Sequence, residues 1–377
     1  MRPGPANSEQ QELRATVRRV LERHPAQVHP AGSYDPALWR LLTEQVGVAS
    51  LAVPERFGGS GAGYAECHLV LEELGREAVS SPFLASAVLA VQALLLGEPM
   101  EDGELLAGLA TGTVTAALIP AGGLIATLDG SWTISGQVRQ VLDGARADEV
   151  LAYAETPSGP ALFRLDVHHP GLWREHSPTV DQSLHLAEIR CQAVAARRLG
   201  RTSRSDDTSR ADDTSRAEDG ARATRVVSRL ADLATIAITA DQCGGARRCL
   251  ELTVEHVKNR VQFGRPIGSF QAVKHRLADL LVLVESAQSA SSAATEAWAD
   301  DADDVPLLAS LAKSYCSEAY RAVTAETIQL HGGIGFTWEH PAHRYFKRAQ
   351  ATAVLFGDPA SHRARLADHL GWTHEPG

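Results

Sequence analysis

Two polar segments in the C-terminal half of the chain carry the residue types best suited to bind a ligand. The first, from Arg260 to Gln271, reads RVQFGRPIGSFQ. Pro266 cannot continue a helix, and Gly264 and Gly268 permit a tight turn. A guanidinium, an aromatic ring and an amide stand close together here, and they can pair with a pyrophosphate, make apolar contact and hydrogen-bond. That combination suits a nucleotide cofactor. The alternative is a plain turn between helices, with Arg260 beside the negative end of a helix dipole.

The second segment, from Gln329 to Phe336, reads QLHGGIGF. Three glycines in four positions let backbone N–H groups approach a ligand closely. The alternative is a helix C-cap, where glycine is also common. His331 is a possible general base, and its alternative is a structural role between Leu330 and Gly332.

The rest of the sequence predicts the elements that hold these segments. Residues 8–110 have apolar residues at helical spacing, and from about residue 112 short segments rich in Val, Ile, Thr and Leu predict an antiparallel β unit. A repeated, charge-alternating stretch from Ser203 to Gly220 lacks large apolar residues and predicts a solvated linker or an extended helix end, with a docking element as the alternative. From about Val226, three long helices with short connections predict an antiparallel bundle. The predicted domains are 1–111, 112–200, 201–224 (the linker) and 225–377.

Composition excludes several classes of protein. A length of 377 residues suggests two or three domains, and a formal net charge of −10 argues against a nucleic-acid partner. No apolar run approaches the roughly 18–20 residues that span a bilayer, and the N-terminus lacks the apolar core of a signal peptide, so we expect a cytoplasmic protein without a membrane span. The five cysteines are scattered and predict no metal site; Cys243 and Cys249 are expected to be buried as small apolar residues.

The two polar segments together resemble a known family. RVQFGRPIGSFQ, followed along the chain by QLHGGIGF, resembles the acyl-CoA dehydrogenase family, and LAVPERFGGSGAGYAE and LEELGRE are similar to that family's N-terminal helical domain. The resemblance implies an α+β multi-domain fold, with an N-terminal helical domain, a middle antiparallel β domain and a C-terminal four-helix bundle that drives dimer and tetramer formation. It also implies α,β-desaturation of an acyl-CoA substrate, in which a carboxylate takes the Cα proton and the flavin of FAD accepts a hydride from Cβ.

The resemblance assigns cofactor-binding residues by position. The residues that would contact the diphosphate and adenosine side of FAD are Arg260, Gln262 and Phe263. The residues that would line the same cofactor are Gln271, Gln329, Gly332 and Gly333. In this family FAD is bound mainly by the neighbouring subunit, which implies an obligate oligomer, either of this chain with itself or with a related acyl-CoA dehydrogenase subunit. An electron acceptor flavoprotein is implied as a further partner.

The usual catalytic base of the family is missing. Its Glu usually stands shortly before the final helix, where this sequence has Phe356, and a second family position for it falls at Ala234. Neither side chain takes a proton. The first candidate base is Asp241, two helical turns beyond Ala234, because a carboxylate in a helix lined by small apolar residues is costly unless it is paired or functional. The alternative is a salt bridge with Arg247 or Arg248, or an exposed helix face.

Asp358 is the second candidate base. It stands where the family has a Thr near the flavin, but it could equally be the N-cap of the final helix, DPASHRARLADHL.

The middle domain also departs from the family pattern. ALIPAGGLIATLDG lacks the hydroxyl and the acid of the family's flavin segment, and Val141, Leu142 and Asp143 stand where the family has a Trp and a Thr or Ser. This asymmetry resembles a subgroup in which two unlike chains form a heterotetramer and divide the cofactor and base between them. Some of these act on CoA thioesters of sterol side chains or other bulky acids.

The sequence therefore predicts an FAD-dependent acyl-CoA dehydrogenase subunit in a heteromeric complex. The alternatives are a non-catalytic partner that completes the FAD site of a related chain, and a flavin oxidase of the same superfamily.

Overall fold

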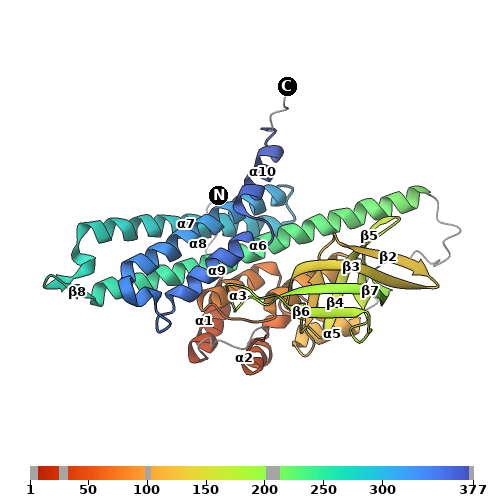
Figure 1. The fold of residues 1–377 in the computed structure, drawn as a ribbon, viewed down its shortest axis with the longest axis horizontal. Helices are drawn as coiled ribbons and strands as arrows, with labels where there is room; N and C mark the ends of the chain where they lie inside the picture. The colour runs from red at the N-terminus through yellow and green to blue at the C-terminus, as the bar shows by residue number, and fades with distance from the viewer. Residues whose placement is uncertain (1–6, 25–32, 98–102, 201–212, 373–377) are drawn as a thin grey trace. The chain divides into compact units, whose positions relative to one another are not determined.

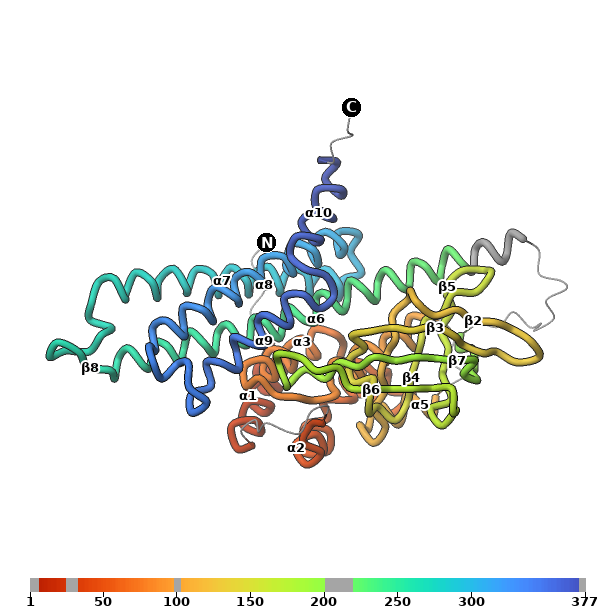
Figure 2. Tube along the Cα trace, viewed as in Figure 1, coloured from red at the N-terminus to blue at the C-terminus, as the bar shows by residue number. Residues whose placement is uncertain are grey.

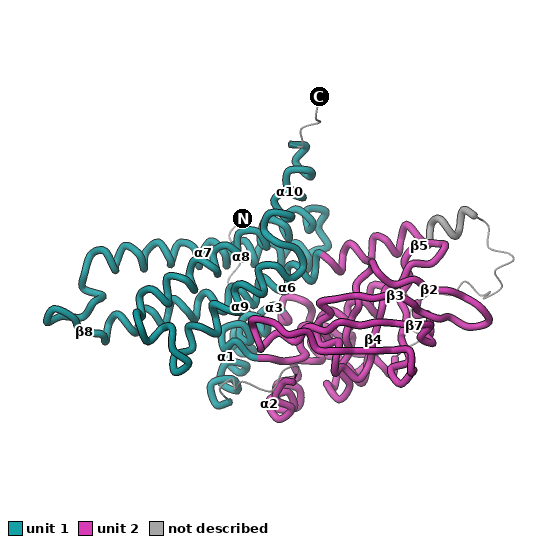
Figure 3. The backbone as a smooth tube through the Cα atoms, in the orientation of Figure 1, with its two compact units in different colours: residues 1–27, 68–79, 232–377 teal, residues 28–67, 80–231 magenta. Residues whose placement is uncertain are grey.

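The computed structural model describes residues 7–24, 33–97, 103–200 and 213–372, whose helices and strands are shown in Figure 1. The chain forms two compact units (Figure 3): unit 1 comprises residues 1–27, 68–79 and 232–377, and unit 2 comprises residues 28–67 and 80–231. The domain limits predicted from the sequence do not coincide with these units and stay predictions; residues 201–212 of the predicted linker lie outside the described residues. Among the described helices, none is long and apolar enough to cross a membrane.

A seven-stranded sheet forms the centre of unit 2. Its strands are β1 (Ala116–Ile119), β2 (Leu124–Asp129), β3 (Ser131–Leu142), β4 (Glu149–Thr156), β5 (Gly159–Leu165), β6 (Leu172–His176) and β7 (Leu186–Arg198). They pair in the order β1-β4-β2-β3-β7-β5, β6 pairs with β7, and β5 also pairs with β4, so the strands close on themselves. The middle β domain is thus confirmed, although it is not purely antiparallel, since β1 and β2 both pair in parallel with β4.

Short helices complete unit 2. They are α2 (Pro36–Leu41), α4 (Val91–Leu96), α5 (Gly103–Thr111) and the π-helical segments Leu42–Val46 and Phe83–Ala90. Asp35 caps α2, since its carboxylate accepts hydrogen bonds from the backbone N–H groups of Ala37 and Leu38. One apolar core lies within the strands around Ile134 and Phe163, and a second joins α4 and α5 to the strands through Leu106.

Unit 1 is helical. Its elements are α1 (Ser8–Arg23), most of α3 (Tyr64–Arg76), the C-terminal part of α6 (Asp213–Asn259), α7 (Gln271–Ala299), α8 (Val305–His331), α9 (Ala342–Val354) and α10 (Pro359–His369). The predicted C-terminal bundle is therefore confirmed. The helix α6 begins at Asp213, earlier than the position near Val226 where the sequence predicted the helical period to return. Ala and Arg residues in this charged stretch favour a helix even without an apolar face.

Two glycines allow α3 and α6 to pack backbone against backbone. A Cβ atom on Gly244 would lie 1.9 Å from the carbonyl oxygen of Glu72, and one on Gly75 would lie 2.2 Å from that of Asp241. Since real Cβ atoms do not approach this closely, only glycine fits at either position. The crossing fixes the part of α6 that carries Asp241.

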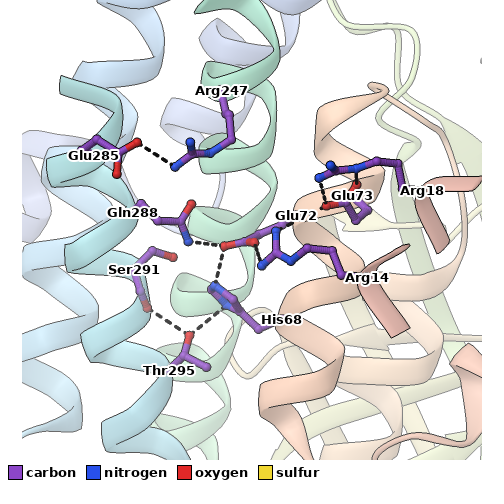
Figure 4. A network of polar contacts seen from close by, with 10 residues as sticks. All are labelled: Arg14, Arg18, His68, Glu72, Glu73, Arg247, Glu285, Gln288, Ser291 and Thr295. Atoms are coloured by element: carbon purple, nitrogen blue, oxygen red, sulfur yellow. Dashed lines mark hydrogen bonds and ion pairs between the residues drawn. The ribbon is translucent and has the colours of Figure 1, made fainter. Parts of the chain in front are cut away.

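A buried polar network holds α3 between α1 and α7 (Figure 4). On the α1 side, Arg14 contacts Glu72 at 2.5 Å, and Arg18 contacts Glu73 at 2.7 Å. On the α7 side, the Gln288 amide donates to Glu72, while the ring of His68 lies 3.3 Å from the same carboxylate. Burial opposes the charge on Glu72, but the hydrogen bond from His68, the charge of Arg14 and the Gln288 bond together lower the pKa of Glu72 to about 2. The carboxylate is therefore charged at neutral pH.

Candidate cofactor site at one end of the helical bundle

The first polar segment forms a β-hairpin between α6 and α7. β8 (Val261–Gln262) and β9 (Arg265–Pro266) flank a two-residue turn in which Phe263 has φ 52° and Gly264 has φ 77°. Two positive φ values in succession are typical of a type I′ turn. The tight turn predicted from the sequence is present, but the hairpin was not foreseen. Phe263 is 91% exposed.

The backbone around the hairpin holds Arg260 in place. Its carbonyl accepts a hydrogen bond from the N–H of Ile267 at 2.8 Å, and its own N–H donates to the carbonyl of His256. Arg260 and Gln262 are exposed, whereas the nearby Arg265 packs over the ring of Phe270, 4.1 Å from the ring centroid.

The second polar segment ends α8. Its last helical residue is His331, and Gly332 follows with φ 66°, in the region that favours glycine. A short 3₁₀-helix, Gly332–Phe336, completes the turn. Gln329, Gly332 and Gly333 are exposed. The predicted alternative of a helix C-cap is thus present in the geometry, because the N–H of Gly332 bonds back to the carbonyls of Gln329 and Ile328.

Both segments lie at the same end of the bundle, where the β8–β9 hairpin projects (Figure 2). The ring of His256, near the end of α6, lies 4.3 Å from the ring of His331, measured between centroids. One turn earlier, the hydroxyl of Thr253 donates to that of Thr327 at 3.1 Å. The fold therefore brings the hairpin and the glycine turn together.

All seven residues that the resemblance assigned to the cofactor lie at this end and are exposed. They are Arg260, Gln262, Phe263, Gln271, Gln329, Gly332 and Gly333. Gln271 opens α7, with its amide 2.9 Å from the ring nitrogen of His275.

The glycines test whether the site fits a nucleotide. Nothing lies within 4 Å of a Cβ placed on Gly264, Gly332 or Gly333, so packing within the described chain does not require glycine there. A positive φ favours glycine at positions 264 and 332. Gly333 has no positive φ and no close neighbour, so neither its backbone conformation nor its packing requires a glycine. A glycine whose backbone faces open space, beside an exposed guanidinium and an exposed ring, fits the diphosphate and adenosine of a dinucleotide such as FAD.

His331 is placed as a structural residue rather than a general base. Its ring is 6% exposed and its Nδ1–H donates to the carbonyl of Thr327 at 2.7 Å. Burial lowers the pKa of His331. The ring stacks between those of His256 and His340, which leaves little room for a reacting atom.

Asp241, the first candidate base, lies buried in an ion pair. Its carboxylate accepts hydrogen bonds from Nε of Arg348 at 3.0 and 3.1 Å and from Nη2 at 2.5 Å, and both residues are buried. The partner is Arg348, not Arg247 or Arg248, which form ion pairs with Glu285 and Glu77. Because both oxygens of Asp241 face guanidinium donors, the geometry favours a structural role, and its assignment as the base stays a prediction.

Asp358, the second candidate, caps the last helix. Its carboxylate accepts a hydrogen bond from the backbone N–H of Ser361 at 2.7 Å. That bond, joined by others from the first turn of α10, lowers the pKa of Asp358. A base needs the opposite shift, so the N-cap alternative is the one that the geometry favours.

The turn that holds Phe356 has partners that the sequence reasoning missed. Phe356 has φ 60°, a strained value for a residue with a side chain, and its carbonyl accepts a hydrogen bond from Nε2 of His362 at 2.9 Å. Shortly before Phe356 in the chain, the carbonyls of Thr352 and Ala353 accept hydrogen bonds from the ammonium of Lys313 at 2.8 and 2.9 Å. Lys313 therefore caps the end of α9. Lys313 is fully buried, and burial lowers its pKa to about 7.

In unit 2, the segment that departs from the family's flavin contacts also contains a half-buried carboxylate, that of Asp143. Val141 and Leu142 are buried, and Asp143 has φ 53°, with its carboxylate 3.4 Å from the ring of His185. The hydroxyl of Ser80 lies 3.1 Å from Nε2 of the same ring. Burial raises the pKa of Asp143, against the effect of His185.

Comparisons with known proteins agree over nearly the whole chain. The model for "Acyl-CoA dehydrogenase, N-terminal domain" matches residues 7–113, and that for "Acyl-CoA dehydrogenase, C-terminal domain" matches residues 223–371. The chain is 36% identical over 368 residues to "Acyl-CoA dehydrogenase IpdE2" from Mycolicibacterium smegmatis, which covers 96% of this chain and 98% of that protein. The protein of the same name from Mycobacterium tuberculosis is 35% identical, with 96% and 97% coverage.

Two solved structures are similar in both fold and sequence. One is described as a variant of the Tcur3481-Tcur3483 steroid ACAD, with a TM-score of 0.84, 30% identity, and coverage of 96% of this chain and 98% of that one. The other is the ChsE4-ChsE5 complex from Mycobacterium tuberculosis, with a TM-score of 0.84, 29% identity, and 98% and 99% coverage.

Proposed function

The chain belongs to the acyl-CoA dehydrogenase family of FAD-dependent oxidoreductases, and we propose that it takes part in α,β-desaturation of a bulky, steroid-type acyl-CoA as one subunit of a heteromeric complex. The observation that carries the proposal is the bundle end where all seven candidate cofactor residues gather, exposed, around glycines that face open space. Two similar structures, one a steroid enzyme and one a complex of two proteins by their descriptions, support the substrate class and the heteromer.

In this proposal each residue at the bundle end has a role toward FAD. Arg260 pairs with the diphosphate, the exposed ring of Phe263 packs on the adenosine side, and the absence of side chains at Gly332 and Gly333 lets the cofactor approach the backbone closely. When bound, FAD supplies the hydride acceptor for the Cβ–H bond. Because these residues point away from the chain's own interior, we infer that they complete a site on a second subunit.

The electrostatic role of Arg260 can be tested against a neighbouring cation. Arg260→Gln is expected to weaken FAD retention by about tenfold or more, since a charge-assisted contact with the diphosphate is lost. Lys258→Gln, which removes the same charge from an exposed position two residues earlier on α6, is the matched control. Equal FAD loss in both variants would mean that only general charge matters, and the assignment of Arg260 would fail.

The heteromer and the substrate class are tested by co-expression. We expect the chain to be colourless alone and yellow when purified with a related acyl-CoA dehydrogenase subunit, and the complex to bleach faster with a steroid-type acyl-CoA than with a short straight-chain one. A yellow, active assembly of this chain alone would contradict the heteromer. A complex without flavin absorbance would contradict the function.

A specific observation also favours the second candidate function, a partner subunit that does no chemistry itself. In this chain Phe356 occupies the family's base position, Asp241 is held by Arg348 and Asp358 caps a helix. The partner would then supply the base. Alanine substitution of the partner's own candidate Glu, with this chain unchanged, should abolish turnover while the yellow colour is kept. Turnover that survives would mean that this chain supplies the base.

A further inference from the structure

Three histidine rings stack at the bundle end and join the elements that carry the two turns. His331, at the end of α8, lies between His256, near the end of α6, and His340, which precedes α9. The ring centroids of each neighbouring pair are 4.3 Å apart. The hairpin begins shortly after His256, and the glycine turn follows His331 directly. Together with the Thr253–Thr327 hydrogen bond, the stack sets one turn against the other.

Hydrogen bonds fix the protonation pattern of two of these rings. Nδ1–H of His331 donates to the carbonyl of Thr327. Nδ1 of His340 accepts the N–H of Ala342 at 3.2 Å, so this nitrogen must be unprotonated. A proton there would break the bond and place a positive charge at the N-terminus of α9, where the helix dipole opposes it.

The surroundings of the stack disfavour a positive charge on all three rings. Burial lowers the pKa of each ring first of all, and that of His340 falls to about 4. The charges that shift these pKa values further come from cations or from the other rings: Arg260 acts on His256, and His343 acts on His340. His343 itself is flanked by Lys347 and Arg344. Within the described part of the chain, no carboxylate is among the groups that shift the three pKa values.

We propose that His256, His331 and His340 are positioning residues whose uncharged, stacked rings hold the hairpin and the glycine turn at the separation that a dinucleotide requires, and that protonation of the stack releases it. The part concerning the dinucleotide rests on the proposed function above. The part concerning the two turns does not. A positive charge on one ring would face a second ring about 4 Å away, beside the buried ring of His331, so even one charge disturbs the stack.

The test places a permanent charge in the stack without changing pH. His256→Lys puts an ammonium beside His331, whereas His256→Phe keeps a flat ring and removes the titrating group. His369→Lys adds the same charge at an exposed position on α10 and is the control. Hydrogen exchange of the segments 253–263 and 327–342 is followed by mass spectrometry in the full chain with its partner, and the FAD dissociation constant is measured by flavin fluorescence.

We expect His256→Lys to speed exchange in both segments and to weaken FAD binding by about tenfold or more at pH 7.5, and the control to do neither. Wild-type binding should weaken from pH 7.5 to pH 5.5, and His256→Phe should show a smaller change. If His256→Lys fails to fold, the comparison of pH dependence between the wild type and His256→Phe tests the proposal on its own. Unchanged exchange in a folded His256→Lys variant, or equal pH dependence in wild type and His256→Phe, would overturn the proposal. Absence of FAD from the wild-type complex would instead refute the proposed function, while hydrogen exchange would still test the stack.

Discussion

Replacing Asp241 by Asn separates a structural role of this carboxylate from a catalytic one. The substitution keeps the shape of the side chain but leaves the guanidinium of Arg348 buried opposite a neutral amide. Breaking a buried ion pair by removing one partner costs about 3–5 kcal/mol of unfolding free energy. Because the Asn oxygen still accepts one hydrogen bond, we expect a loss at the lower end, about 3 kcal/mol.

A second carboxylate on the same helix provides the matched control. Asp232 also pairs with an arginine at 2.6 Å, but the side chain of that partner, Arg365, is 39% exposed. Water can therefore solvate the guanidinium that Asp232→Asn leaves behind, and we expect a loss of only about 1 kcal/mol. Urea unfolding followed by far-UV circular dichroism measures both losses. A double variant, Asp241→Leu with Arg348→Met, should recover much of the stability that Asp241→Asn loses, since no unpaired charge remains.

Turnover per bound FAD completes the experiment. If the pair is structural, the folded Asp241→Asn complex should keep its turnover within about threefold, less than about 1 kcal/mol in the barrier. A stability loss below about 1 kcal/mol would refute the reasoning from the buried pair. Abolished turnover at full FAD occupancy would establish Asp241 as the base.

Three further substitutions test single contacts in unit 1. Because the folded pKa of Lys313 is about 7 and the unfolded value 10.5, the unfolded chain binds the extra proton between these values and stability rises with pH. Lys313→Met should remove a rise of about 3 kcal/mol between pH 7 and about pH 9.5 in urea unfolding, and an unchanged rise would assign it to another group. Glu72 titrates in the opposite range: its folded pKa is about 2 and its unfolded value 4.5, so its stabilisation is present above pH 4.5 and is lost as the pH falls toward 2. Glu72→Gln should cost about 3 kcal/mol at pH 7 and flatten that acid limb; an equally steep limb would contradict the assignment. Asp358→Ala should lower the midpoint of urea unfolding by loss of the cap and leave FAD content unchanged, whereas loss of turnover would assign Asp358 a role in the reaction.

The sequence predicted the features that depend on local chemistry. Gly264 and Pro266 marked the first turn, and Asp358 stood where the final helix begins and caps it. The hairpin geometry was not predictable, since a positive φ at a phenylalanine contradicts its intrinsic preference.

The sequence could not predict which residues far apart in the chain form ion pairs and hydrogen bonds with each other. Asp241 and Arg348 are 107 residues apart, and nothing in either segment identifies the other. Lys313 gave a readable signal, because it falls on the same helix face as Ala309, Cys316 and Tyr320, all of them buried. A lysine on an apolar face predicts a buried cation, but its acceptors, two carbonyls at the end of α9, depend on the tertiary fold.

The division of the chain into units bears on how the protein can be dissected. The polypeptide passes from one unit to the other four times, after residues 27, 67, 79 and 231. Neither unit is a contiguous stretch. A truncation that isolates the bundle at Asp232 therefore discards α1 and α3, and with them the contacts of Glu72 with Gln288 and of Gly75 with Asp241. Fragment complementation or circular permutation, rather than simple deletion, is the way to obtain the cofactor-binding helices on their own.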